Sequence, residues 1–335
     1  MGFDPKILDF SSNVNPLGFP ASVRNGLKKT STLFSVYPDS DSAKLKSSLQ
    51  KYTGVQKDQI TVGNGATEII YNFCKAFLGR KNALVPIPVF GEYESAARLH
   101  GAKVSHFETM NLNYDIDGFL KAIPKNHCTF VCNPNNPTGV LVSQKNMLKI
   151  LDVSRASSAL VFVDECFIEL ASNPRESIVP KLRKYDNLFI LRSMTKSFGL
   201  AGLRVGYGLG SKKMVEILNR IKIPWNVSGI AQEAATKALS SMSHLEKTRR
   251  LVEKERKFLK NSISKINGFQ CYDSDANFVL IKSRKNSKQL QKKLLKKNIL
   301  VRDCSSFRGL DDRFIRIAVR THGENQKLVR ELGKT

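Results

Sequence analysis

The sequence has few of the residues that stabilise very small, secreted or metal-binding proteins. Its 335 residues include six cysteines and five histidines. The cysteines form no C-x-x-C pair, and the histidines show no metal-ligand spacing, so we expect no metal site. No apolar run approaches the roughly 18 residues of a membrane span, and Met1–Pro20 lacks the apolar stretch of a secretion signal. Disulfide scaffolds and membrane proteins are therefore disfavoured, and we expect reduced cysteines in a cytoplasmic protein.

Acidic residues are also scarce, because 29 Asp and Glu stand against 54 Lys and Arg, a formal net charge of +25. This sign of charge favours acidic partners: nucleic acid, an anionic membrane or a phosphorylated small molecule. The densest basic run, 282–297, has leucines at helical spacing and lysines on the other side, which is typical of a solvated helix face. It has no interleaved aromatic residues and no nucleic-acid-binding motif, so we do not expect nucleic acid as a partner. Without a long apolar run we do not expect a membrane either.

The apolar residues that are present, 41% of the chain, suffice for one large or two medium domains. Short apolar runs that suit buried strands recur along the middle of the chain, at 83–86, 129–132, 159–163, 188–191 and 205–209. The segment 144–155 between two of these runs has helical spacing, and this alternation predicts a mainly parallel sheet. After Pro224 the pattern changes to long charged helices within 230–260 and two further strands, at 278–281 and 314–319, which predict a smaller α+β domain.

Four polar segments each end or follow a predicted strand, where open α/β sheets bind their ligands. They are Gly63–Glu68, Asn133–Gly139, Asp164 and Arg192–Tyr207. Taken singly, each has an ordinary structural explanation: a helix N-cap, a rigid turn, a salt bridge and a surface lysine with basic neighbours.

The chemistry of these segments suits a phosphorylated ligand that carries a cation and can form a Schiff base. Small residues with a Thr at 65–67 open an apparent helix, whose N–H groups would bind a phosphate. The Asp164 carboxylate follows an apolar strand and needs a cation, such as a protonated pyridine nitrogen. Lys196 lies among small, apolar and cationic residues, which should lower its pKa and favour a Schiff base. Asn136 could donate its amide to a ligand oxygen.

Taken together, the motifs Asn-Pro-x-Asn-Pro-Thr-Gly, Asp-Glu and Ser-x-x-Lys with a downstream Arg resemble the fold type I, aspartate-aminotransferase-like family of pyridoxal-phosphate enzymes. The resemblance covers residues 9–325. It implies an α/β fold with a large domain, in which a mainly parallel seven-stranded sheet lies between helices, and a smaller α+β C-terminal domain. We expect the segment 1–30 to pack with the small domain, the large cofactor-binding domain to span 31–230, and the small domain to span 231–335.

The resemblance also implies pyridoxal 5'-phosphate (PLP) as the cofactor and assigns site residues. Lys196 would bind the cofactor and move protons, and Asp164 would pair with the ring nitrogen. The other implied cofactor contacts are Gly65, Ala66, Thr67, Phe90 with Tyr93 as its alternative, Asn136, Ser193, Arg204 and, from the neighbouring subunit of a homodimer, Tyr37. The implied substrate contacts are Asn15, Gly18, Arg302, Arg316 and Arg320, with His322 as a further candidate for a substrate phosphate.

The segment Asn13–Gly18 is similar to two branches of the family, the threonine-phosphate decarboxylases and the histidinol-phosphate aminotransferases. Phe167, where most aminotransferases of the family have a Tyr, favours the first branch, as do Arg302–Asp311 and Asp9–Asn13. We therefore expect PLP-dependent decarboxylation of L-threonine O-3-phosphate to (R)-1-amino-2-propanol O-2-phosphate in cobalamin biosynthesis. The alternative is transamination of histidinol phosphate with 2-oxoglutarate in histidine biosynthesis. A basic nucleic-acid-binding protein on an old enzyme fold is disfavoured by the intact Lys196.

Overall fold

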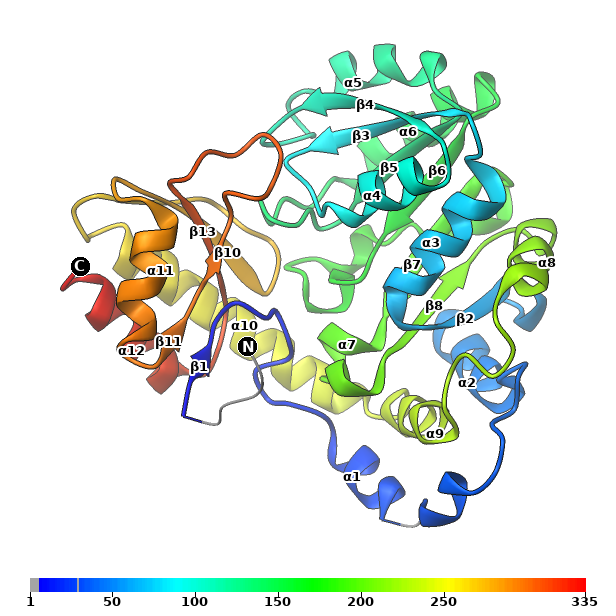
Figure 1. The fold of residues 1–335 in the computed structure, drawn as a ribbon, viewed down its shortest axis with the longest axis horizontal. Coiled ribbons are helices and arrows are strands. Elements are labelled where there is room, and N and C mark those ends of the chain that lie inside the picture. Colours follow the sequence, from blue (N-terminus) through cyan, green and yellow to red (C-terminus); the bar gives the residue numbers. More distant parts are fainter. Residues whose placement is uncertain (1–5, 29) are drawn as a thin grey trace.

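The computed structural model describes residues 6–28 and 30–335, and within these residues the strands form a seven-stranded, a four-stranded and a two-stranded sheet. The large sheet and its helices make one lobe, and the four-stranded sheet with its helices makes a smaller lobe beside it (Figure 1). The N-terminal segment runs between the two lobes. This arrangement confirms the predicted α/β fold with a large sheet domain and a separate small one.

The large sheet has one antiparallel strand among parallel ones. Its order is β2 (Ile60–Asn64), β8 (Val205–Leu209), β7 (Leu188–Ser193), β6 (Leu160–Asp164), β5 (Cys128–Cys132), β3 (Asn82–Ile87) and β4 (Lys103–Glu108). Strand β8 runs antiparallel to β2 and β7, and the other neighbours pair in parallel. The five predicted apolar runs are β3, β5, β6, β7 and β8, which confirms the predicted parallel core.

Helices cover both faces of the large sheet, which explains why its central strands are apolar throughout. One face packs against α3 (Gly65–Phe77), α4 (Glu92–Leu99) and α8 (Lys212–Ile221). The other face packs against α2 (Ala43–Thr53), α5 (Ile116–Ala122), α6 (Gln144–Ala156) and α9 (Gly229–Ala238). The short α1 (Ala21–Leu27) lies on α9, and α7 (Met194–Ser197) follows β7 directly.

A cluster of aromatic rings holds strands β5, β6 and β7 against α3 and α4. The ring of Phe162 lies 4.8 Å from Phe73, 5.2 Å from Phe130 and 5.4 Å from Phe189, between ring centroids. Tyr93 of α4 stacks on Phe130 at 5.4 Å. The polar segments singled out above begin where these strands end. The aromatic cluster therefore fixes the positions of the strand ends from which those segments start.

The small lobe is built on an antiparallel sheet of order β12 (Arg302–Asp303), β13 (Phe314–Ala318), β10 (Phe278–Ser283) and β9 (Phe269–Cys271). Helices α11 (Ser287–Leu295) and α12 (His322–Leu332) complete it. The N-terminal strand β1 (Leu8–Asp9) pairs in parallel with β11 (Ile299–Leu300), so the start of the described chain packs on this lobe.

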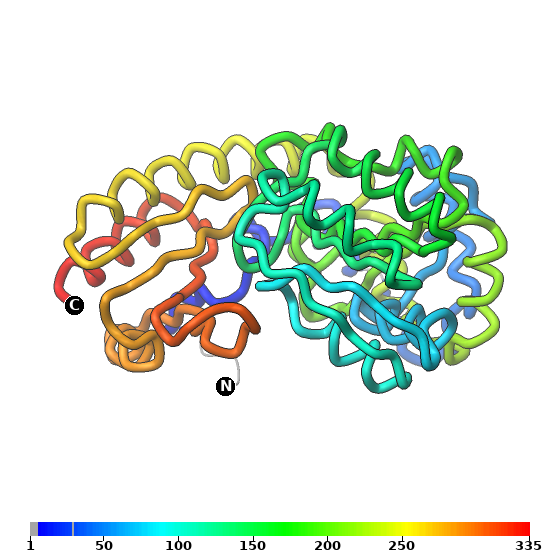
Figure 2. The backbone as a smooth tube through the Cα atoms, turned by 90° about the horizontal axis from the view of Figure 1, so that it is seen from above, coloured from blue at the N-terminus to red at the C-terminus, as the bar shows by residue number. Residues whose placement is uncertain are grey.

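Helix α10 (Met242–Ile263) connects the two lobes and runs along both of them (Figure 2). Leu245 near its start belongs to the core of the large lobe, whereas Val252 and Leu259 belong to the core of the small one. The cores therefore change over inside α10, and α9 packs with the large lobe. The predicted boundary at 230 stays a prediction. The last strand of the large sheet ends before it, at Leu209.

The six cysteines all carry free thiols. Within residues 6–28 and 30–335 there is no helix long and apolar enough to cross a membrane, and no group of acidic, His and Cys side chains that could hold a metal ion.

We expect Phe162→Ala to lower the free energy of unfolding by about 3–5 kcal/mol, because the change leaves a cavity among four aromatic rings. Phe162 is fully buried. Urea denaturation followed by circular dichroism measures the loss. The control is Tyr114→Ala, since Tyr114 is 86% exposed and should change stability by less than about 0.5 kcal/mol. Equal losses in both variants would contradict the assigned core.

Candidate active site

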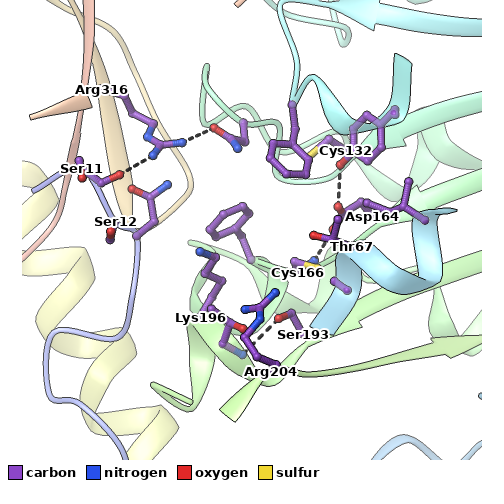
Figure 3. Close-up of a pocket in the computed structure, with 18 residues that line it drawn as sticks. Ser11, Ser12, Thr67, Cys132, Asp164, Cys166, Ser193, Lys196, Arg204 and Arg316 are labelled. Atoms are coloured by element: carbon purple, nitrogen blue, oxygen red, sulfur yellow. Dashed lines mark hydrogen bonds between the residues drawn. The ribbon is translucent and has the colours of Figure 1, made fainter. Parts of the chain in front are cut away.

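A cavity of about 260 Å³ lies at the carboxyl ends of β5, β6 and β7, between the two lobes (Figure 3). Its wall includes the last residues of these strands, Cys132, Asp164 and Ser193, and Arg316 from the small sheet. The size is close to the lower end of small-molecule sites, roughly 300–1,000 Å³. The cavity therefore suits a compact ligand, at the sheet edge where ligands of α/β proteins bind.

The structure brings most of the predicted site residues together in this cavity, although they span 250 positions of the sequence. Those that line it are Ala66, Thr67, Phe90, Tyr93, Asn136, Asp164, Phe167, Ser193, Lys196, Arg204 and Arg316. Seven residues to which the sequence analysis assigned no role in the site also line the cavity: Ser11, Ser12, Asn13, Ile70, Cys132, Cys166 and Thr195.

One corner of the cavity combines the start of α3 with hydroxyl groups and a guanidinium. Gly65 has φ +81°, and a Cβ there would lie 2.5 Å from Arg204 Nη2. A Cβ at Gly206 would lie 2.5 Å from the backbone nitrogen of Ala66. Only glycine allows these close approaches. The free N–H groups of a helix start, with Arg204 and the hydroxyl of Ser193 beside them, suit a phosphate.

The carboxylate of Asp164 lies deep in the cavity and is held by two donors. The Tyr93 hydroxyl donates to Oδ2 at 2.6 Å, and the backbone N–H of Cys166 donates to Oδ1 at 2.8 Å. Burial raises the pKa of Asp164. Among the described residues no cation forms an ion pair with it, so a buried anion faces the cavity without a positive partner. A ligand that carries a protonated ring nitrogen would supply one.

The Lys196 amine lies on α7, with Nζ 5.8 Å from the centre of the Phe167 ring. Burial, and then the charges of Arg316 and Arg204, lower the pKa of Lys196 to about 8. In the part of the chain that the structure describes, Nζ has no hydrogen-bond partner. A usable fraction of the amine is therefore neutral near pH 7, which is the nucleophilic form.

The guanidinium of Arg316 closes the cavity on the side of the small lobe. It donates to Oδ1 of Asn136 at 2.5 Å and to the carbonyl of Ser11 at 2.7 Å. Burial lowers the pKa of Arg316 to about 10, and no carboxylate within 6–28 and 30–335 forms an ion pair with it. A buried cation without an anionic partner suits a ligand carboxylate. The Nδ2 group of Asn136 is likewise left without a described acceptor.

Asn15 and Gly18, predicted as substrate contacts, do not line the cavity but hold the loop that carries Lys196. The backbone N–H of Asn15 donates to the carbonyl of Lys196 at 2.9 Å, and its Nδ2 donates to the carbonyl of Ser197 at 2.7 Å. The backbone of Gly18 lies so close to Gly199 that a Cβ on Gly199 would be 2.6 Å from it. The two residues thus contact the loop that carries Lys196 from outside the cavity.

Three further predicted residues also lie outside the cavity of the single chain. Tyr37 is 83% exposed, and its ring is 5.1 Å from that of Trp225. Arg320 donates to Glu324 and to the carbonyl of Asp9. Arg302 is exposed but pairs in register with Arg316 across β12 and β13, so it lies beside the cavity wall.

Two residues of the sequence analysis have a different surrounding from the one expected. Tyr93, the alternative for stacking on a cofactor, already stacks on Phe130 and uses its hydroxyl on Asp164. His322, a candidate for a phosphate, contacts the buried carboxylate of Glu255 instead.

The fold and this cavity define a fold type I PLP-dependent enzyme. The sequence matches the family of aminotransferases class I and II over residues 5–332, and the chain belongs to this family. A protein of Caldanaerobacter subterraneus with the provisional name threonine-phosphate decarboxylase is 35% identical over 96% of this chain and 88% of its own length.

Two solved structures share almost the whole fold. The histidinol-phosphate aminotransferase of Clostridium acetobutylicum is 33% identical, with a TM-score of 0.91 over 98% of both chains. The L-threonine-O-3-phosphate decarboxylase of Porphyromonas gingivalis is 27% identical, with a TM-score of 0.90 over 98% of this chain and 99% of its own. The relatives thus include both branches of the family.

PLP is the cofactor of this family, and the cavity fits it in three places. Asp164 is a buried carboxylate without a cation, Lys196 is an amine with a pKa of about 8, and the start of α3 is a corner suited to a phosphate. These groups match the ring nitrogen, the aldehyde and the phosphate of PLP.

In the cofactor-free protein, we expect the acetylation rate of Lys196 to rise with pH with a midpoint near 8, because the amine reacts only after it loses its proton. Arg316→Met should move this midpoint upward, since the Arg316 charge lowers the pKa of Lys196. Peptide mass spectrometry at a series of pH values measures the rate. Arg313→Met removes an equal but distant charge and should leave the midpoint in place. A midpoint near 10.5 in the wild type would contradict the buried setting of the amine.

Proposed function

We propose that this chain is a cytoplasmic threonine-phosphate decarboxylase, a PLP-dependent lyase that converts L-threonine O-3-phosphate to (R)-1-amino-2-propanol O-2-phosphate in cobalamin biosynthesis. The observation that carries the proposal is Phe167. It lines the cavity beside the amine of Lys196, at the position where the family resemblance implies a tyrosine hydroxyl in most aminotransferases. The relative that is 35% identical and bears the decarboxylase name supports it.

The residues of the cavity divide the work of holding the cofactor. Lys196 would bind it covalently, and Asp164, fixed by Tyr93, would accept a hydrogen bond from the ring nitrogen. Asn136 would donate its Nδ2 to the phenolic oxygen, and Phe90 would pack against the ring. Gly65, Ala66, Thr67, Ser193 and Arg204 would hold the phosphate. Once bound, PLP supplies a protonated ring that accepts the electron pair left at Cα when carbon dioxide departs.

The side of the small lobe binds the substrate. Arg316 is buried and has no anionic partner within residues 6–28 and 30–335, and its planar fork suits a carboxylate. Arg302, opposite Arg316 across the strands, forms no ion pair within residues 6–28 and 30–335 and donates only to the hydroxyl of Ser306, so its charge can bind the substrate phosphate. Arg320 would first have to release Glu324. Lys196, with a pKa of about 8, returns a proton to Cα after carbon dioxide has left.

The second candidate function is histidinol-phosphate aminotransferase. The solved structure with that name, 33% identical at a TM-score of 0.91, favours it. The same Lys196, Asp164 and Arg316 would serve this reaction, which needs 2-oxoglutarate as the acceptor of the amino group.

We expect the purified enzyme, loaded with PLP, to release carbon dioxide from L-threonine O-3-phosphate without any keto acid. The product, 1-amino-2-propanol phosphate, is measured by mass spectrometry together with the released gas. Lys196→Ala is the control and should abolish turnover. The second candidate would be established instead if the enzyme forms glutamate from histidinol phosphate and 2-oxoglutarate and releases no carbon dioxide from phosphothreonine.

We also propose that the active enzyme is a homodimer in which Tyr37 reaches the cofactor phosphate of the neighbouring subunit. Tyr37 belongs to an exposed apolar face with Phe34, Val36, Ile223 and Trp225, which are 53–83% exposed. This face lacks an apolar cover in the single chain, and exposed apolar patches of this kind are typical of subunit interfaces. A second copy would bury it and complete both cavities.

Mixed dimers test the shared cavity. We expect Tyr37→Ala and Lys196→Ala each to be impaired, and co-expression of the two to restore about a quarter of the wild-type activity. The reason is that half of the dimers then contain one cavity with both an intact lysine and an intact tyrosine. Two different affinity tags isolate the mixed dimer, and sedimentation measures its mass. Activity of the mixture no higher than the mean of the parents, or a monomer in sedimentation, would contradict the shared site.

A further inference from the structure

Three residues that adjoin cavity residues in the sequence meet on the opposite side of the sheet. Glu165 follows Asp164, Arg192 precedes Ser193, and Ser197 follows Lys196. Arg192 and Ser193 are successive residues of β7, and successive side chains of a strand point to opposite faces. None of the three neighbours lines the first cavity. Arg192 instead faces a second cavity, which Glu169, Tyr52 and Arg249 also line.

A single guanidinium joins these neighbours. Arg192 donates through Nε and Nη2 to Oε2 of Glu165, at 2.9 and 2.7 Å, and through Nη1 to Oε1 of Glu169 at 2.9 Å. The Ser197 hydroxyl donates to the other oxygen of Glu169, Oε2, at 2.7 Å. We call Glu165, Glu169, Arg192 and Ser197 the back frame.

The back frame is almost completely removed from water. The side chains of Arg192, Glu165 and Glu169 are 8%, 0% and 6% exposed. Burial opposes the charge of Arg192, but Glu165 and Glu169 together raise its pKa well above the ordinary value. Buried ion triads of this kind add little net stability compared with apolar residues of the same size. Their more useful property is that each bond fixes a direction and a distance.

The turn that carries Lys196 needs such fixing. Helix α7 is four residues long, too short to be stable by itself. Asn15 holds it from one side through the carbonyls of Lys196 and Ser197. The bond from Ser197 to Glu169 holds it from the other side and links it to the strand ends of Asp164 and Ser193 through Arg192.

We propose that the back frame is a positioning device, which sets the spacing of Lys196, Asp164 and Ser193 and thereby the affinity for PLP. The proposal rests on the cofactor-binding roles proposed above for these three residues. Glu169 and Ser197 act only through the residues that they hold, and neither lines the first cavity.

Three variants test the proposal: Ser197→Ala, Glu169→Ala and Glu169→Gln. We expect the two alanine variants to weaken PLP binding by about tenfold, the effect of one lost hydrogen bond to a charged group. They should also raise the pKa of Lys196 above 8, because the loosened turn admits water to the amine. Glu169→Gln should keep both properties near wild type, since its oxygen can accept from Arg192 while its amide donates to Ser197. Absorbance titration gives the affinity, and acetylation of the cofactor-free protein gives the pKa.

The matched control is Glu255→Ala. Glu255 is also fully buried, and it bonds to His322 and Asn325 in the small lobe. This variant should lose thermal stability but keep the wild-type affinity for PLP and the wild-type titration of Lys196.

Unchanged affinity and titration in Ser197→Ala, or equal changes in Glu255→Ala, would overturn the proposal. If Glu169→Ala does not fold, Ser197→Ala decides alone, because it removes one hydroxyl and leaves the ion pairs intact. If the wild type does not bind PLP, the proposed cofactor site is wrong, whereas the titration of Lys196 in the cofactor-free variants still tests the back frame.

Discussion

The rest of the site depends on charges that the chain buries without balancing. Among the residues that the structure describes, Asp164 has donors but no cationic partner, and Arg316 has acceptors but no anionic partner. Lys196 lines the same cavity, where burial and then the charge of Arg316 lower its pKa to about 8. Burying such groups costs free energy on folding. A ligand with a cationic ring nitrogen and a carboxylate would offset this cost, because it would pair with Asp164 and Arg316. The cavity is therefore specified by charge as much as by shape.

The sequence predicts those strands that show a continuous apolar pattern over neighbouring residues. Strands β3, β5, β6, β7 and β8 are buried on both faces and read as continuous apolar runs. Strand β4 is only partly buried and lacks such a run, and β2 contains Gly63 and few large apolar residues, so the pattern alone missed both. The seven-stranded sheet was predicted only through the family resemblance.

The site shows the same division. Lys196, Asp164 and Asn136 were predicted from motifs and do meet in one cavity. Asn15 donates to the backbone carbonyl of Ser197, 182 positions away, in the loop of Lys196. Every residue has a backbone carbonyl, so the sequence gives no sign of this bond. The bond from Tyr93 to Asp164 likewise depends on how α4 packs against β6. Such hydrogen bonds join residues that are far apart in the sequence, so they depend on tertiary packing and not on a local motif.

The N-terminal segment fastens the two lobes to each other. Phe10 accepts a backbone hydrogen bond from Ala318 of the small lobe, and Asn15 is bonded to the loop of Lys196 in the large lobe. The five residue steps between them reach at most roughly 17 Å when fully extended. This short connection limits how far the small lobe can move away from the large one. A wide opening of the cavity to solvent would therefore require the hydrogen bond at Phe10 or the one at Asn15 to break.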